Sequence, residues 1–166
     1  MDNLQPDHEV FDKVWQRVLD SNRENTSEQP TQSVQRTDAE ILEEFMEDEA
    51  FDAAYYTLLS NRVGGGVRSV LRAMANDERA HLKKLRTAYF ILTGDTYTPQ
   101  TVPVKVAGVA DALRKRYIAE TEASAAYLKA AANAGRPDLT ELYKRLSEDE
   151  RRHSELVNRM LEALMG

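Results

Sequence analysis

Asp-Glu-Arg-Ala-His at residues 77–81 and Asp-Glu-Arg-Arg-His at residues 149–153 are two copies of one short motif. In each copy the glutamate precedes the histidine by three residues, a spacing that puts both side chains on one face of an α-helix. The chain contains only three histidines, and the two motifs use two of them. The third, His8, lies outside the pattern, and we expect it at the surface. The repeat therefore predicts two helices that carry the same polar groups at matching positions.

Apolar residues around the motifs recur every three or four positions, which predicts long amphipathic helices and no strand. Four such helices are expected, at residues 37–63, 67–93, 107–134 and 137–166. Thr37 and Glu40 form a capping-box pattern at the start of the first helix. Gly94 suits the C-terminal cap of the second helix, and Pro137 suits the first turn of the fourth.

The turns between these helices predict how the chain is connected. Gly64–Gly66 and Gly135 are short breaks, so each joins two neighbouring helices into an antiparallel hairpin. The segment 95–106 is expected to be extended, and at ~3.3 Å per residue it can run the length of the bundle once. We therefore expect an all-α domain at residues 37–166, a four-helix bundle with one long crossover.

Residues 1–36 are predicted to form a separate N-terminal region. A short amphipathic helix at 7–20 carries one apolar stripe that includes Trp15, and we expect it to dock on the bundle or on a second subunit. Residues 21–36 show no periodicity and are expected to form a polar strap.

Composition excludes several classes of function. The chain has 166 residues, no cysteine and a net charge of −6. Without cysteine there are no disulfides, zinc ribbons or thiol catalysis. The negative charge and the lack of a basic cluster argue against nucleic acid, and no apolar run approaches the ~20 residues of a membrane span. Because the N-terminus is acidic and polar rather than a secretory signal, we expect a cytoplasmic protein with no nucleic-acid or membrane partner.

Acidic residues interrupt the apolar stripe of each long helix near its middle. On the helix at 107–134 the stripe is predicted to contain Val109, Leu113, Tyr117, Glu120, Tyr127 and Ala131. Residues that are equally far from a hairpin turn lie at one level of the bundle. Glu49 and Glu78 are about equally far from the glycine turn, and Glu120 and Glu150 are equally far from Gly135. We therefore expect four glutamates in one buried layer.

Four buried carboxylates would repel one another and would be badly desolvated. The helices expected at 67–93 and 137–166 place no lysine or arginine on the core stripe at that level. Metal ions are the expected compensation. With His81 and His153, the glutamates would give mixed oxygen and nitrogen ligation, which suits two iron or manganese ions, with zinc as a further candidate.

With these residues the chain resembles the ferritin-like di-iron carboxylate family, and within it the rubrerythrins and bacterioferritins. The family signature is one glutamate from each of two helices and a Glu-x-x-His pair from each of the other two. The resemblance covers about residues 37–165 and implies two iron ions held by Glu49, Glu78, His81, Glu120, Glu150 and His153. It implies that Glu78 and Glu150 bridge the two ions. Glu47 and Glu122 remain alternatives to the first- and third-helix ligands.

The resemblance to rubrerythrins also implies catalytic residues near the metals. Tyr56 matches a tyrosine that rubrerythrins place seven residues after the first ligand, and Tyr127 occupies the corresponding place in the other half. Rubrerythrins carry an additional glutamate where this chain has Ala123, and Asp52 holds the equivalent position in the first half. We expect both tyrosines and Asp52 to deliver protons or to quench radicals, with Asp52 either beside the metals or a labile ligand.

The activity that the resemblance implies is the reduction of hydrogen peroxide by a di-iron centre. Typical rubrerythrins add a rubredoxin domain with four cysteines, and this chain has none, so a separate protein would donate the electrons. Dioxygen is the alternative oxidant. A ferroxidase or iron-storage protein of the bacterioferritin kind and a passive metal-binding module are the alternative functions, and a homodimer is the expected assembly.

Overall fold

The computed structural model describes residues 36–100, 103–106 and 108–165. It contains four helices: α2 (Asp38–Ser60), α3 (Gly65–Thr93), α4 (Val109–Asn133) and α5 (Pro137–Met165). Within those ranges there is no strand, and every helix boundary lies within three residues of its expected place. The expected N-terminal helix at 7–20 and the polar strap, apart from Arg36, lie outside the described residues and stay predictions.

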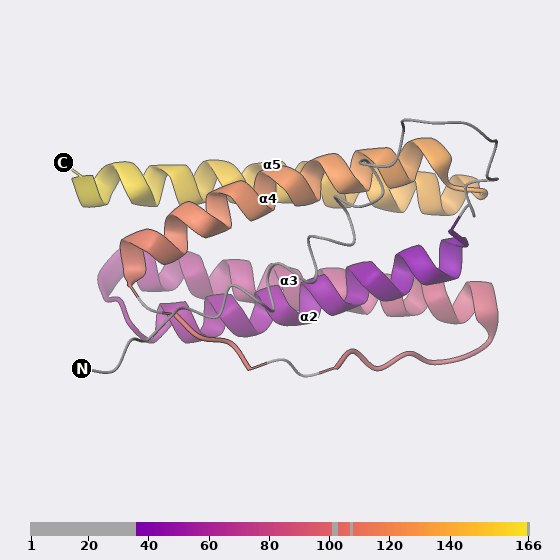
Figure 1. Ribbon diagram of the computed structural model, residues 1–166, viewed down its shortest axis with the longest axis horizontal. Coiled ribbons are helices and arrows are strands. Elements are labelled where there is room, and N and C mark those ends of the chain that lie inside the picture. Colours follow the sequence, from indigo (N-terminus) through magenta and orange to yellow (C-terminus); the bar gives the residue numbers. More distant parts are fainter. Residues whose placement is uncertain (1–35, 101–102, 107, 166) are drawn as a thin grey trace, which may run out of the picture. The chain divides into compact units, whose positions relative to one another are not determined.

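The four helices form two antiparallel hairpins. α2 packs along α3 and α4 packs along α5, while α3 lies beside α5 and α2 lies beside α4 (Figure 1). The chain between α3 and α4 leads from one end of the bundle to the other, so α4 runs in the same direction as α3 (Figure 1). The predicted all-α four-helix bundle with one long crossover is confirmed.

The helix ends follow the local sequence signals. Thr37 caps α2, because its hydroxyl accepts from the Glu40 N–H at 3.2 Å while the Glu40 carboxylate accepts from the Thr37 N–H at 2.8 Å. Gly94 ends α3 with a φ of 78°, a left-handed conformation that glycine adopts without steric cost, and its N–H donates to the Phe90 carbonyl at 2.9 Å. Pro137 opens α5, as expected.

Two apolar clusters make up the core, and the polar layer lies between them. The first cluster includes Tyr55, Tyr56, Leu59, Leu71, Met74, Leu113, Val157 and Met160. The second includes Leu42, Phe45, Met46, Leu85, Tyr127, Tyr143 and Leu146. Since each fully buried large apolar side chain contributes about 1.5–3 kcal/mol, packing holds the helices together on both sides of the polar residues.

The crossover is held against α2 by hydrogen bonds. The Tyr97 hydroxyl donates to Glu47 Oε1 at 2.6 Å, and the Gln100 N–H donates to Glu47 Oε2 at 2.9 Å. Further along, the Arg62 guanidinium donates to the Val106 carbonyl. Glu47 therefore has a structural role on the outer side of α2.

One position of the stripe predicted for α4 is wrong. Tyr117 is 41% exposed, and its neighbour Arg116 is buried at 4% exposure. The apolar pattern favoured the tyrosine, but the packed face of α4 runs through Leu113, Arg116 and Glu120, which lie three and four residues apart. The interior of the bundle therefore contains an arginine that the sequence pattern did not reveal.

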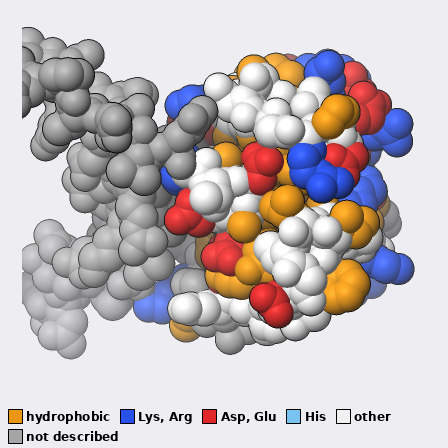
Figure 2. All heavy atoms as spheres, turned by 90° about the vertical axis from the view of Figure 1, so that its right-hand side faces the viewer, with side chains coloured by type: hydrophobic (Ala, Val, Ile, Leu, Met, Phe, Trp, Pro, Cys, Tyr) orange, Lys and Arg blue, Asp and Glu red, His pale blue; other side chains and the backbone are white. Residues whose placement is uncertain are grey.

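One end of the bundle has a surface of mixed character. Figure 2 looks onto the end of the bundle where α4 passes into α5, and on its described residues hydrophobic, acidic and basic side chains are interspersed, with no histidine visible. None of the described helices has both the length and the apolar character required to cross a membrane.

Candidate metal centre

Six metal-ligating side chains from all four helices meet in the polar layer, and none is more than 5% exposed. They form two overlapping groups, and within each group one possible ligand atom per residue lies within 4.8 Å of the others. The Glu49 half consists of Glu49, Glu78, His81 and Glu150. The Glu120 half consists of Glu78, Glu120, Glu150 and His153.

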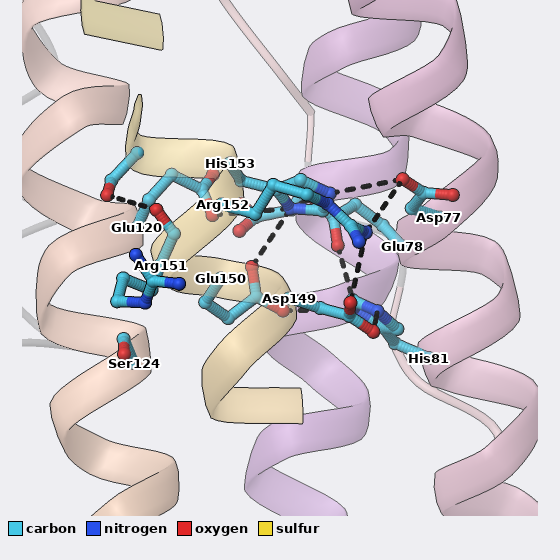
Figure 3. A network of polar contacts seen from close by, with 12 residues as sticks. Asp77, Glu78, His81, Glu120, Ser124, Asp149, Glu150, Arg151, Arg152 and His153 are labelled. Atoms are coloured by element: carbon cyan, nitrogen blue, oxygen red, sulfur yellow. Dashed lines mark hydrogen bonds and ion pairs between the residues drawn. The ribbon is translucent and has the colours of Figure 1, made fainter. Parts of the chain in front are cut away.

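Glu78 and Glu150, which belong to both halves, turn one oxygen toward each. His81 Nδ1 lies 3.1 Å from Glu78 Oε2 and 3.0 Å from Glu150 Oε1. His153 Nδ1 lies 3.1 Å from Glu78 Oε1 and 3.1 Å from Glu150 Oε2. Figure 3 shows both glutamates between the two histidines. A carboxylate placed in this way can bridge two cations.

One further carboxylate completes each half. Glu49 Oε2 lies 3.3 Å from His81 Nδ1, and Glu120 Oε2 lies 3.7 Å from His153 Nδ1. The two imidazole rings are stacked with their centroids 5.8 Å apart. The structure thus brings together all six residues that the sequence singled out, in an arrangement with approximate twofold symmetry.

The alternative acids do not join the layer. Glu47 binds the crossover, and Glu122 is exposed on α4. Neither residue belongs to the two groups.

Two aspartates that sequence reasoning passed over orient the histidines. His81 Nε2 lies 3.1 Å from Asp149 Oδ2, and His153 Nε2 lies 3.3 Å from Asp77 Oδ2 (Figure 3). Each aspartate is the first residue of one motif and contacts the histidine of the other motif. A carboxylate on the far nitrogen fixes the orientation of an imidazole and keeps its other nitrogen aimed at the centre. The signal was present in the repeat itself, which includes the aspartate in both copies.

The two tyrosines donate hydrogen bonds to the terminal glutamates. The Tyr127 hydroxyl donates to Glu49 Oε1, and the Tyr56 hydroxyl donates to Glu120 Oε1. Each tyrosine therefore donates its hydrogen bond to the glutamate on the other helix, not to the glutamate seven residues before it in its own helix. Burial raises the pKa of both hydroxyls well above the ordinary value, so they remain protonated donors.

Arg116 places a buried cation beside the Glu120 half. Its Nη2 donates to Glu120 Oε1 at 2.7 Å and also to Asp52, and its Nε donates to the Tyr56 hydroxyl at 3.3 Å. Asp52, whose side chain is 17% exposed, reaches the layer through this arginine and belongs to neither half. Arg116 lies four residues before Glu120 on the same helical face, but Tyr117, three residues before Glu120, fitted the sequence pattern as well.

Protons and the arginine can offset the negative charge of these acids. Burial raises the pKa of Glu49 and Glu150 to about 7. Burial disfavours the charged form of His81, but its contacts with three carboxylates, first among them Glu150, raise its pKa to about 12. The pKa of His153 is raised for the same reason. The surrounding carboxylates therefore favour the cationic form of both rings.

The pKa of Glu120 is shifted in the opposite direction to those of Glu49 and Glu150. Burial acts to raise the pKa of Glu120, but the Arg116 guanidinium and the His153 ring outweigh that effect and hold it below its ordinary value. Its carboxylate stays ionised when Glu49 and Glu150 take up protons.

The residues present fit a pair of metal ions. Among the described residues, the buried atoms of this layer that make no hydrogen bond of good geometry are Glu78 Oε1, Glu78 Oε2, His81 Nδ1, Glu120 Oε2 and Glu150 Oε1. Ion-pair contacts of 3.0–3.7 Å join them to other side chains of the same layer, and several buried polar atoms that converge in this way without hydrogen bonds are placed to bind cations. Carboxylate oxygens with imidazole nitrogens are a donor set that suits iron and manganese.

Comparisons with known proteins agree with this fold. A family model described as the ferritin-like domain matches residues 34–163. Among solved structures, a hypothetical protein from Pyrococcus furiosus superposes with a TM-score of 0.69 at 20% sequence identity, covering 76% of this chain and 89% of that chain, which shows a shared fold. A comparison with curated proteins found no significant match. The bundle, its layer of carboxylates and histidines and the family match together establish that the chain belongs to the ferritin-like domain family.

Proposed function

We propose that the protein is a rubrerythrin-like di-iron enzyme that reduces hydrogen peroxide with electrons from a separate donor protein. The observation that carries the proposal is the pair Glu78 and Glu150, each of which turns one oxygen to either half. In this proposal Glu49 and His81 hold one iron ion, and Glu120 and His153 hold the other. Four carboxylates then balance the charge of two divalent ions.

The chemistry of the bound metals would be a two-electron reduction. Bound by these residues, an iron pair would supply two electrons, which with two protons would convert one hydrogen peroxide into two molecules of water. In this proposal a separate protein supplies the two electrons that return the iron pair to the ferrous state.

The chain's own residues would supply the protons that peroxide reduction consumes. Tyr56 and Tyr127 hold hydroxyl protons directly against the terminal glutamates of the two halves. Asp52 is partly exposed and holds Arg116, which in turn donates to the Tyr56 hydroxyl; the guanidinium keeps its charge and passes no proton itself. We therefore assign the tyrosines to proton holding at the centre and Asp52, through Arg116, to keeping Tyr56 in place.

An anaerobic titration tests the proposal. Protein loaded with ferrous iron should contain two ions per chain and should be oxidised by one equivalent of hydrogen peroxide, faster than by dioxygen. Replacing both His81 and His153 with alanine should abolish iron binding. Iron-loaded protein that does not react with peroxide would end the peroxidase proposal, and intact metal binding in the double variant would show that the ligand set is wrong.

The titration, gel filtration and elemental analysis together distinguish the other functions that the site could serve. A ferroxidase or storage protein would react faster with dioxygen, take up many irons per chain and elute from gel filtration as a large assembly rather than the proposed dimer. A passive binding module would hold metal without reacting. Elemental analysis of protein from native cells would distinguish iron from manganese and zinc.

A further inference from the structure

The two halves of the centre differ at the position four residues before the terminal glutamate. Before Glu120 this position holds Arg116, and before Glu49 it holds Phe45. Phe45 is buried and stacks on the Tyr127 ring, with centroids 4.1 Å apart. The approximate symmetry of the ligands is therefore broken by a cation on one side and an aromatic ring on the other.

Arg116 is held firmly in place. Its guanidinium carbon lies 5.5 Å from the Tyr55 ring centroid and 5.2 Å from that of Tyr56, within the range of cation–π contact. This contact and the hydrogen bonds to Asp52, Tyr56 and Glu120 hold the side chain, which is only 4% exposed. The positive charge stays beside the Glu120 half.

This charge weakens Glu120 as a metal ligand. Glu120 Oε1 accepts hydrogen bonds from both Arg116 and Tyr56, whereas Glu49 Oε1 accepts one from Tyr127. An oxygen that shares its charge with a guanidinium donates less to a metal, and a fixed cation also repels a divalent ion nearby.

The negative charge of Asp52 partly neutralises the positive charge of Arg116. Its Oδ2 contacts the same Nη2 of Arg116 that contacts Glu120 Oε1, so the guanidinium lies between the two carboxylates. Asp52 has no counterpart on the other side, where Ala123 holds the equivalent position three residues after the terminal glutamate. The pair therefore belongs to one half of the centre.

We propose that Arg116 makes the two metal positions unequal, so that the Glu49 half binds a divalent ion tightly and first, and the Glu120 half binds the second ion weakly. In this view Arg116 is a positioning residue that affects metal binding through its contact with Glu120. Asp52 reduces the effect of its charge. The inference rests on the proposed function, because it presupposes that the centre holds two ions.

Anaerobic titration with Co²⁺ alone, followed by visible absorption and calorimetry, tests the order of binding. Repulsion between two bound ions weakens the second step in any such centre, so each half is measured separately. His153→Ala leaves the Glu49 half and should keep one tight step. His81→Ala leaves the Glu120 half and should bind one ion about 10- to 100-fold more weakly.

Substitutions of Arg116 test whether its charge weakens the second binding step. Arg116→Met should strengthen the second step of the otherwise unchanged protein by about tenfold or more, since the cation is gone. Arg116→Lys keeps the charge and should keep the second step weak. Phe45→Met is the matched control on the other side and should leave both steps unchanged. Asp52→Asn removes the counter-charge and should weaken the second step further.

The outcomes separate this inference from the proposed function. Equal affinities of the His81→Ala and His153→Ala variants, or the reverse order, overturn the inference while the two-metal centre stands. A second step that is the same in Arg116→Met and Arg116→Lys also overturns it. Should Arg116→Met fail to fold, the Asp52→Asn variant decides, because an unchanged second step there contradicts a charge effect. No Co²⁺ binding by the unmodified protein overturns both.

Discussion

Each histidine of the centre depends on an aspartate from the other motif. Asp149 on α5 contacts His81 on α3, and Asp77 on α3 contacts His153 on α5. Arg152 adds a link, because it lies 3.0 Å from Asp149 Oδ1 and 3.7 Å from Asp77 Oδ2. The repeated motif therefore works as a crossed pair rather than as two independent units.

This crossing predicts which half each aspartate supports. Asp149→Asn should weaken metal binding in the Glu49 half by about 10- to 100-fold, because loss of the carboxylate loosens the orientation of the His81 ring. The effect should appear in full in a His153→Ala background and should vanish in a His81→Ala background. Calorimetric titration with Co²⁺ measures both.

Glu148→Gln is the matched control, since Glu148 is the exposed neighbour of Asp149 on the same helix. It should bind metal as the unmodified protein does. If Asp149→Asn acted instead on the half that contains its own motif's histidine, the crossed arrangement would be wrong.

The cationic histidines predict a steep pH dependence of metal binding. At neutral pH both rings must lose a proton before Nδ1 can bind a metal, so two ions should displace at least about two protons and the overall affinity should fall about 100-fold for each pH unit lowered. The pKa of His81, about 12 in the metal-free protein, means that this slope continues well above pH 6.5. Calorimetry in buffers of different ionisation enthalpy counts the protons, and the release of fewer than about two protons above pH 7, where Glu49 and Glu150 are ionised, would contradict cationic rings.

The same shifts set the stability of the metal-free protein. Because the pKa of Glu49 and Glu150 is raised to about 7, protonation of these residues stabilises the folded protein. This stabilisation is complete below pH 4.5 and is lost as the pH rises through 7. The raised pKa of His81 contributes stability that is complete below pH 6.5 and lost as the pH rises toward 12. The increase in Tm on adding metal should therefore be larger at pH 8 than at pH 5. A smaller increase at pH 8 would show that protonation of these residues does not stabilise the protein without metal.

At the scale of single elements, the end of α3 depends on the left-handed conformation of Gly94. Gly94→Ala should lower the free energy of unfolding by about 1–2 kcal/mol, because a Cβ is strained at a φ of 78°. Gly66, inside the first turn of the same helix, has no positive φ and no atom within 4 Å of an added Cβ. Gly66→Ala should therefore raise the stability by up to about 1 kcal/mol. Urea denaturation measures both, and equal effects of the two substitutions would contradict this account.

At the scale of the whole bundle, Glu47 holds the crossover against α2. Glu47→Ala removes the acceptor for the Tyr97 hydroxyl and the Gln100 N–H, so we expect a loss of about 1 kcal/mol and faster amide exchange at the start of the crossover. Metal affinity should not change, whereas Glu49→Gln should weaken binding in the Glu49 half. Hydrogen exchange by mass spectrometry and metal titration together check this, and a loss of metal in Glu47→Ala would restore Glu47 as a candidate ligand.

What the sequence by itself determined is the bundle and the composition of its polar layer. The turns at Gly64–Gly66 and Gly135 set the register of each hairpin, and a repeat of three and four residues places the same face inward along each helix. Counting from those turns was enough to bring Glu49 level with Glu78, and Glu120 level with Glu150, because a hairpin has one register once its turn is known.

Only the tertiary structure decided which side chains meet across the two hairpins. Sequence distance does not say that α2 lies beside α4 and α3 beside α5, and these neighbours are what bring Tyr56 to Glu120 and Asp149 to His81. Periodicity also locates the inward face of a helix only to within about one residue, so it could not choose Arg116 over Tyr117. That choice depends on the rotation of α4 about its own axis, which the packing against α5 and α2 determines.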